Sequence, residues 1–233
     1  ALPTLVLQLD TTFPVVPWVL LVYLLTQSTL MLSVGRLGDM ISKKTIFTTG
    51  FVIFTVGSVL CGLAPSIFWL IAFRVVQAIG AAMALALGFA ITTEAFPPTE
   101  RGRAMGVIST VVSVGIVLGP TLGGLIIEAL SWRWIFFVNL PVGILGTIVA
   151  VRYIPKTAPE GGQKFDYWGA LSLFGSVLAL LLGLTLGQQL GFSHPLILLL
   201  LAGWLLFLVI FTLVEWRIGQ PMVDLSLFKD IIF

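Results

Sequence analysis

The sequence predicts an all-α membrane protein with seven transmembrane helices, and three observations support this fold class. Hydrophobic residues make up 58% of the 233-residue chain and charged residues only 9%, whereas a soluble domain contains about 45–50% apolar residues. Apolar runs of about 20 residues, long enough to cross a bilayer, occur seven times. The runs are continuous and lack the alternation of barrel strands, so their backbone groups must form hydrogen bonds within helices.

The predicted helices follow one another along the whole chain. The apolar runs are too long and too numerous for a signal peptide. Mean hydropathy is +1.13, which agrees with repeated burial in lipid. Cys61 is the one cysteine of the sequence, so it forms no internal disulfide. The predicted helix boundaries are 14–34, 45–64, 66–94, 104–127, 134–154, 165–187 and 195–217.

The basic residues indicate the orientation in the membrane. Ten of the twelve Lys and Arg residues fall in alternate connections or at their edges, and cytoplasmic loops carry such an excess. We therefore expect the first residue outside and residue 233 in the cytoplasm. The net charge of +2 does not suggest a nucleic-acid partner. The ten residues are Arg36, Lys43, Lys44, Arg101, Arg103, Arg152, Lys156, Lys164, Arg217 and Lys229.

A polar stretch suggests a domain boundary. Residues 155–164, PKTAPEGGQK, have the composition of a flexible linker on the inner side. This linker separates residues 1–154 from a helical hairpin at 165–217, after which residues 218–233 lead toward another apolar segment. The sequence does not begin with Met. We expect further membrane segments before and after it.

The aromatic residues carry less information. The 7 Trp, 17 Phe and 3 Tyr would suit a hydrophobic cavity, but aromatic side chains also face lipid, so they do not identify a substrate. In the predicted outer turn SWRW, we expect Trp132 and Trp134 at the membrane interface, where indole rings prefer to lie.

Glycine recurs in the stretch GIVLGPTLGG. Gly115, Gly119 and Gly123 stand at four-residue spacing, so they share one face of a helix. Small residues at this spacing let a second helix approach closely in lipid. Pro120 removes a hydrogen bond and is expected to kink the helix. A static packing groove and a moving helix contact are both compatible with this pattern.

The stretch RVVQAIGAA places a cation inside a predicted helix. Arg74 lies about 12 Å deep, at 1.5 Å per residue from the outer end. An arginine within a membrane is costly and usually faces the bundle interior. Gln77 follows one turn later, and Gly80 begins a stripe of small residues. The alternative is an arginine that extends to the outer interface and bonds to carbonyl groups.

The inner stretch GRLGDMISKK concentrates charge between two apolar runs. We expect Gly35 and Gly38 to form a tight turn. Lys43 and Lys44 precede a helix N-terminus, which disfavours cations. An acid should therefore hold one of them, and Glu94 is available at the same inner level. The alternative is a solvated positive loop.

In order and position, these three stretches resemble the signature motifs of the major facilitator superfamily. EAFPPTERGRAMG and SWRWIFFVNLPVG resemble its fourteen-helix drug:proton antiporter branch. The chain would then correspond to helices two to eight: an amino-terminal bundle lacking its first helix, plus the two-helix insert at 165–217. The sequence departs from the inner motif, since Met40, Ser42 and Lys43 replace the usual Arg, Gly and Arg; Ala78 replaces a Gly in the fourth-helix motif.

The resemblance implies the site residues and their roles. Asp39 would face the other half of the transporter, and an inner lysine would face Glu94. The energy source would be a proton gradient, with no cofactor and no enzymatic activity. The partners would be the lipid bilayer, a small-molecule substrate, the first helix and the carboxy-terminal half, in a bacterial cytoplasmic membrane. The implied transport and gating residues are Gly35, Asp39, Lys43, Lys44, Arg74, Gln77, Gly80, Glu94, Arg103, Gly115, Gly119, Pro120, Gly123 and Gly124.

The leading hypothesis is a secondary transporter that exports amphipathic or cationic compounds in exchange for protons by alternating access. Two alternatives remain: a seven-helix receptor or retinal protein, although 195–217 has no lysine for retinal, and a membrane subunit that transports nothing itself. No carboxylate is expected at mid-membrane depth, so the resemblance places the proton-carrying acid in the first helix. The acids at the edges are Asp10, Asp39, Glu94, Glu100, Glu128, Glu160, Asp166, Glu215, Asp224 and Asp230.

Overall fold

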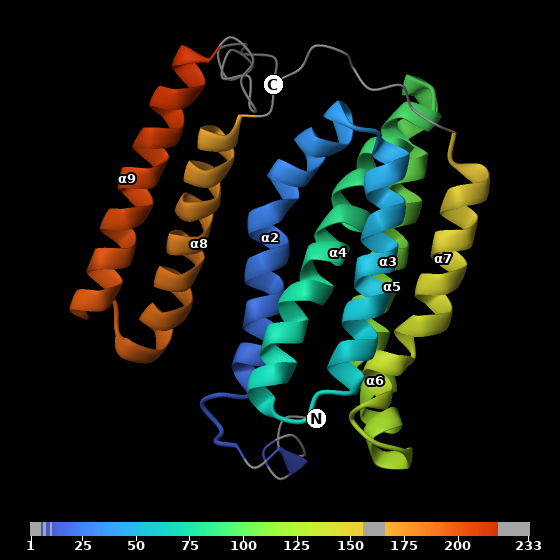
Figure 1. Ribbon diagram of the computed structural model, residues 1–233, viewed down its shortest axis with the longest axis horizontal. Coiled ribbons are helices and arrows are strands. Elements are labelled where there is room, and N and C mark those ends of the chain that lie inside the picture. Colours follow the sequence, from blue (N-terminus) through green and yellow to red (C-terminus); the bar gives the residue numbers. More distant parts are fainter. Residues whose placement is uncertain (1–5, 7, 10, 156–165, 219–233) are drawn as a thin grey trace.

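The computed structural model describes residues 6, 8–9, 11–155 and 166–218. Within these residues, seven segments are long and apolar enough to cross a membrane, which confirms the predicted fold class. Figure 1 shows them side by side, with the α8–α9 pair beyond α2 and α7 at the opposite margin. The helices are α2 (Pro17–Met40), α3 (Lys43–Gly62), α4 (Ile67–Ala95), α5 (Pro98–Ala129), α6 (Trp134–Phe137), α7 (Asn139–Tyr153), α8 (Tyr167–Leu190) and α9 (Pro195–Arg217).

Helix α4 is the centre of the bundle. It packs along α2 on one side and along α3 on the other. Helix α3 also packs against α7, and α8 packs against both α9 and α2. The short α6 and α7 together form a single span of 20 residues. Almost all of the predicted linker and of the predicted final connection, 156–165 and 219–233, lies outside the described residues.

The α3–α4 contact depends on glycine. A Cβ atom on Gly50 would lie 2.7 Å from the Met83 Cβ, and one on Gly57 would lie 2.6 Å from the Gln77 Cα. A Cβ on Gly80 would lie 2.6 Å from the Gly50 carbonyl oxygen and would also meet the backbone of Phe54. These glycines let the two backbones touch, as small residues do between membrane helices.

The predicted inner turn is wrong in its extent. Helix α2 continues to Met40, so Gly35 and Gly38 are helical and do not form a turn. Gly38 is buried, and a Cβ there would meet the Leu87 side chain, so its smallness serves packing against α4. Ile41 and Ser42 alone separate the two helices.

Helix α5 begins six residues earlier than predicted. Pro98 occupies the first turn, where its missing N–H costs nothing, and the acidic Glu100 follows it there. Arg101 and Arg103 are therefore helical residues. The Arg101 Nε atom donates to the Phe96 carbonyl oxygen at 3.1 Å, back across the start of the helix.

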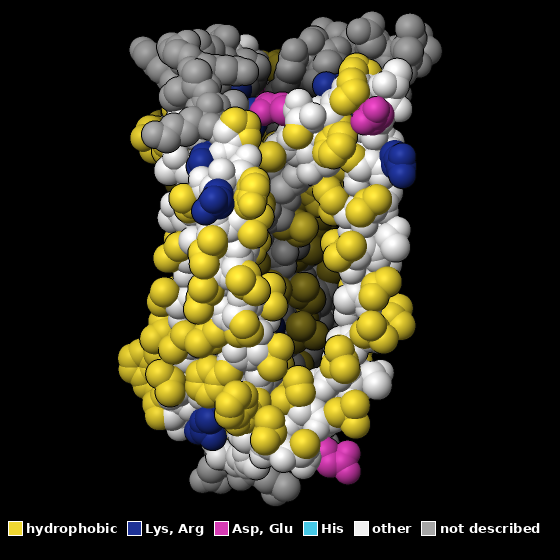
Figure 2. Space-filling model, turned by 90° about the vertical axis from the view of Figure 1, so that its right-hand side faces the viewer, with side chains coloured by type: hydrophobic (Ala, Val, Ile, Leu, Met, Phe, Trp, Pro, Cys, Tyr) yellow, Lys and Arg dark blue, Asp and Glu magenta, His cyan; other side chains and the backbone are white. Residues whose placement is uncertain are grey.

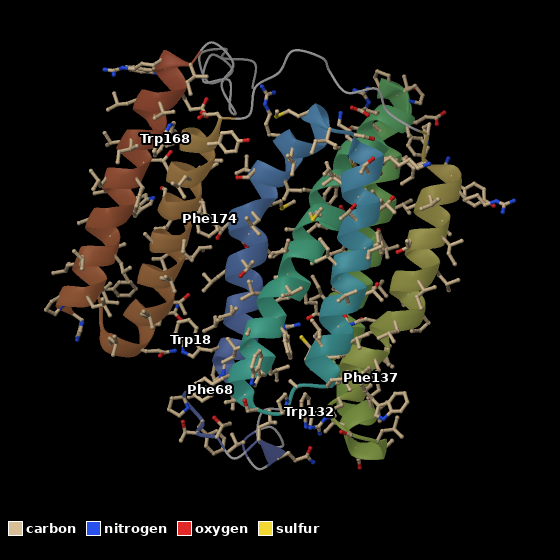
Figure 3. All side chains as sticks on the ribbon, in the orientation of Figure 1. Trp18, Phe68, Trp132, Phe137, Trp168 and Phe174 are labelled. Carbon is tan, nitrogen blue, oxygen red and sulfur yellow. The ribbon has the colours of Figure 1, made fainter. Side chains whose placement is uncertain are left out.

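Trp132, expected at the membrane interface, lies near one end of the bundle (Figure 3) with its side chain inside the protein. Its side chain is only 1% exposed and belongs to a buried cluster with Cys61, Leu70 and Phe136. The Arg133 guanidinium lies 4.6 Å from the Trp132 ring centroid. Trp134 is 47% exposed, as expected for an interfacial residue. Figure 3 shows Trp132 near the same end of the bundle as Trp18 and Phe68, whereas Trp168 lies toward the opposite end.

Candidate functional site

Arg74 projects from α4 toward α2. Its Nε atom donates to the Val19 carbonyl oxygen at 3.0 Å, and its Nη1 atom donates to the Gln77 Oε1 atom at 2.7 Å. Its Cζ atom lies 4.2 Å from the ring centroid of Tyr23 and 5.7 Å from that of Phe136. Ion pairs of the described residues do not include Arg74. Arg74 therefore bonds both to a side chain one turn along α4 and to a backbone carbonyl group of α2.

Gln77 extends this network into α3. Its side chain is 1% exposed, and its Nε2 atom donates to the Ser58 Oγ atom at 2.7 Å. The Ser58 hydroxyl donates in turn to the Phe54 carbonyl oxygen at 2.8 Å. The Cys61 thiol lies 3.9 Å from the Gln77 Oε1 atom. Because polar groups in lipid need partners, this chain of bonds, which we call the Arg74 network (Val19, Arg74, Gln77, Ser58), links α2, α4 and α3.

A second cluster lies at the end of the bundle that carries Lys43, which we call the basic end. The Lys43 Nζ atom lies 2.8 Å from the Asp39 Oδ1 atom and also forms an ion pair with Glu94. The Lys43 side chain is 10% exposed and that of Glu94 is 48% exposed. The predicted lysine–Glu94 pair is therefore confirmed, and Lys43 makes it.

Lys44 has a different partner. Its Nζ atom donates to the Val151 carbonyl oxygen at 2.7 Å, near the end of α7. Carbonyl groups of a last helical turn lack helical partners and attract cations. Lys44 therefore fastens α3 to α7, while Lys43 fastens α2 and α3 to α4.

The glycines of α5 are not packed within the described chain. Cβ atoms built on Gly115, Gly119, Gly123 and Gly124 meet no atom within 4 Å. No residue of α5 is buried, and the helix continues through Pro120. The structure thus shows no partner for this face among the described residues, and packing against a helix outside them stays a prediction. Gly35 likewise has open space around it.

An open cavity of about 540 Å³ lies among α2, α3, α4 and α5. Its wall is mostly apolar, with Gln27 and Thr92 as polar members. A second cavity of about 340 Å³ shares Thr92 and Ile108 with it and includes Glu100 and Arg103. Figure 2, which views the side of the molecule where α7 lies in Figure 1, shows a long furrow with hydrophobic side chains. The first cavity is lined by Gln27, Phe47, Phe51, Phe54, Ala81, Ala84, Leu85, Gly88, Phe89, Ile91, Thr92 and Ile108.

Several residues of the Arg74 site and of the α3–α4 contact were not predicted from the sequence. Ser58 and Tyr23 lie in mostly apolar helices that also carry other polar residues, and nothing in their spacing marks them. The pair Gly50 and Gly57 did carry a signal, because glycines seven residues apart lie on one face of a helix. The described residues contain no group of three or more His, Cys, Asp or Glu side chains suited to a metal ion.

The seven spans thus carry a partly buried cation network and a charged cluster at the basic end. The family model described as "Major Facilitator Superfamily" matches residues 1–216 of this chain. The chain belongs to this superfamily, which consists of transporters and not enzymes, and it is an integral membrane protein.

Three of the relatives come from bacteria. "Riboflavin transporter RibZ" of Clostridioides difficile (strain 630) is 35% identical, with 98% of this chain and 49% of that protein aligned. "Multidrug resistance protein 3" of Bacillus subtilis (strain 168) is 34% identical, with 93% and 42% aligned. "Multidrug resistance protein Stp" of Mycobacterium tuberculosis (strain ATCC 25618 / H37Rv) is 35% identical, with 91% and 40% aligned. The chain spans less than half the length of each relative.

Proposed function

We propose that this chain works as part of a secondary active transporter that exports amphipathic or drug-like molecules in exchange for protons by alternating access. The observation that carries the proposal is the Arg74 network. A charged side chain at this depth is costly, and here residues of three helices hold it in place. The names of the bacterial multidrug relatives support the substrate class.

We further propose that the basic end is cytoplasmic, in a bacterial inner membrane. The lysines there lie at the edges of spans, as cytoplasmic basic residues do. The Asp39–Lys43–Glu94 cluster joins α2, α3 and α4, and we assign it to closure of the inner side. Arg103 lines the smaller cavity near this end and belongs to the same gating set.

The functional unit that we propose has two parts. Residues 1–154 form an amino-terminal bundle, and the hairpin at 165–217 is an insert between two halves, with 155–164 as its linker and 218–233 as the following connection. The partners are lipid, a small-molecule substrate, a further first helix and a second half. The unpacked glycine face of α5 supports such partners. The proton carrier belongs to these further helices, because the Arg74 network has no carboxylate among the described residues.

The test uses the full-length protein, meaning a chain extended to the length of the relatives. Proteoliposomes with an imposed pH gradient are loaded with a fluorescent cationic dye, and riboflavin is assayed in parallel. Arg74→Ala should lower gradient-driven transport about tenfold or more, since hydrogen bonds to a charged group contribute about 1.5–3 kcal/mol each.

The matched control is Arg152→Ala. Arg152 is an exposed arginine in the last turn of α7, outside the Arg74 network, and its removal should leave transport intact. The 233-residue chain alone should not accumulate dye in response to the gradient. Accumulation by the 233-residue chain that disappears on Arg74→Ala would place the proton carrier within this chain and contradict our assignment.

A further inference from the structure

The Tyr23 ring lies beside the guanidinium group of Arg74. The Arg74 Cζ atom is 4.2 Å from the ring centroid, within the roughly 6 Å of a cation–π contact. Tyr23 stands one turn after Val19, whose carbonyl oxygen accepts from the Arg74 Nε atom. Residues four apart lie on the same side of a helix. Helix α2 therefore offers Arg74 an aromatic ring and a carbonyl oxygen together.

These contacts act on different parts of the guanidinium group. The group is planar, with N–H donors along its edge and weakly hydrated faces that stack on aromatic rings. Val19 and Gln77 accept hydrogen bonds on the edge. The N–H groups on Nη2 form no hydrogen bond to the described residues. Two hydrogen bonds fix two nitrogen atoms, and the Tyr23 ring lies 4.2 Å from the Cζ atom that joins them.

We infer that Tyr23 is a positioning residue for Arg74: its ring holds the guanidinium plane in the orientation that keeps the Nη2 donors available. The expected effect of Tyr23 on transport rests on the proposed function. The position of Arg74 beside Tyr23 does not, because it is a property of the described chain. The ring, and not the hydroxyl group, makes this contact. Tyr23→Phe should therefore preserve the position of Arg74, and an aliphatic residue should not.

The first experiment measures the position without transport. The 233-residue chain is labelled with ¹⁵N-arginine in detergent micelles, and the Arg74 Nε–H signal is assigned by its loss in Arg74→Lys. A ring close to this group shifts the proton resonance and slows rotation of the guanidinium group. Wild type and Tyr23→Phe should share this signature, and Tyr23→Leu should lose most of it, since only the more distant Phe136 ring, 5.7 Å from the Arg74 Cζ atom, remains. Tyr23→Met, whose unbranched and more flexible side chain adapts better to the site, serves if Tyr23→Leu does not fold. An unchanged Arg74 signal in Tyr23→Leu or Tyr23→Met would overturn the inference.

The second experiment measures the consequence in the full-length protein. Tyr23→Leu should lower the transport rate roughly two- to thirtyfold, the range that a contact of this kind supports, and should shift the pH profile of transport. Tyr23→Phe should stay within about twofold of wild type. Leu24→Ala, at an exposed neighbouring position, is the control and should leave both measurements unchanged.

The two experiments separate the inference from the proposed function. A structural defect would lower the amount of active protein without moving the pH profile. If Arg74→Ala leaves transport intact, the proposed function fails, while the arginine signal still decides whether Tyr23 positions Arg74. If the Arg74 signal changes but the pH profile of Tyr23→Leu does not, positioning stands and its consequence in transport is refuted.

Discussion

Helices α4 and α5 are neighbours in the sequence, with 29 and 32 residues, and both are apolar with small residues at helical spacing. Their surroundings are opposite. Helix α4 buries nine residues, including Gln77 and Gly80, between α2 and α3. Helix α5 buries none, and its glycines meet open space.

The difference shows that one sequence pattern has two meanings. On α4, small residues form a contact that is complete within the described chain and that carries the Arg74 network. On α5, they form a surface that the described residues leave open, and its cover by a helix outside them is our prediction. The spacing of small residues in the sequence indicates a helix face with small side chains, but it does not indicate which helix covers that face.

The largest expected effect is on the α4 side. Gly80→Leu would force a side chain onto the Phe54 backbone, where no rotamer can move it away. Overpacking usually costs about 1–3 kcal/mol and occasionally more; against backbone atoms we expect at least about 3 kcal/mol. Thermal unfolding of the 233-residue chain in detergent should show a large loss of stability.

The control for Gly80→Leu is Gly203→Leu on α9. A Cβ atom at Gly203 meets no atom within 4 Å, so the same change in side-chain size should leave the unfolding temperature nearly unchanged. Equal unfolding temperatures for wild type and Gly80→Leu would contradict the close α3–α4 contact.

On the α5 side, the expected effect is functional. Gly119→Leu should leave the unfolding temperature of the 233-residue chain unchanged, because the added side chain enters open space. In the full-length protein it should abolish transport while membrane insertion, measured by the amount of protein in the membrane fraction, remains normal. Unchanged export by Gly119→Leu would show that this face has no moving partner.

The smallest expected effect concerns the Lys43–Glu94 ion pair between α3 and α4. Because Glu94 is 48% exposed, solvent weakens its attraction to Lys43, and we expect a coupling energy of about 1 kcal/mol or less. A double-mutant cycle of Lys43→Met and Glu94→Gln, measured by thermal unfolding at low and high salt, checks this. A coupling energy well above that value, or one that does not change with salt, would indicate an ion pair from which water is excluded.

The predicted and observed helix bounds agree best where a proline and a capping residue mark the end of an apolar run. The seventh span, 195–217, agrees with α9 at both ends, because Pro195 starts the helix and His194 caps it. The Lys43–Glu94 pair was also predictable, since the lysines stand at an unfavourable helix end. Gly35 and Gly38 were assigned to a turn because glycine suits both turns and close helix contacts. Tyr23 and Ser58 could not be found, because their roles depend on how α2 and α3 lie against α4.

Carbene footprinting with a lipid-soluble diazirine tests the central claim most directly, because it needs no substitution. The 233-residue chain and the full-length protein are labelled in bilayers, and the label on each helix is measured by mass spectrometry. Residues 115–124 of α5 should be labelled as strongly as α9 in the 233-residue chain and several-fold less in the full-length protein. The Gly80 region of α4 should be protected in both. Equal labelling of residues 115–124 in the two proteins would contradict the claim that this face of α5 is covered by a helix outside the described residues.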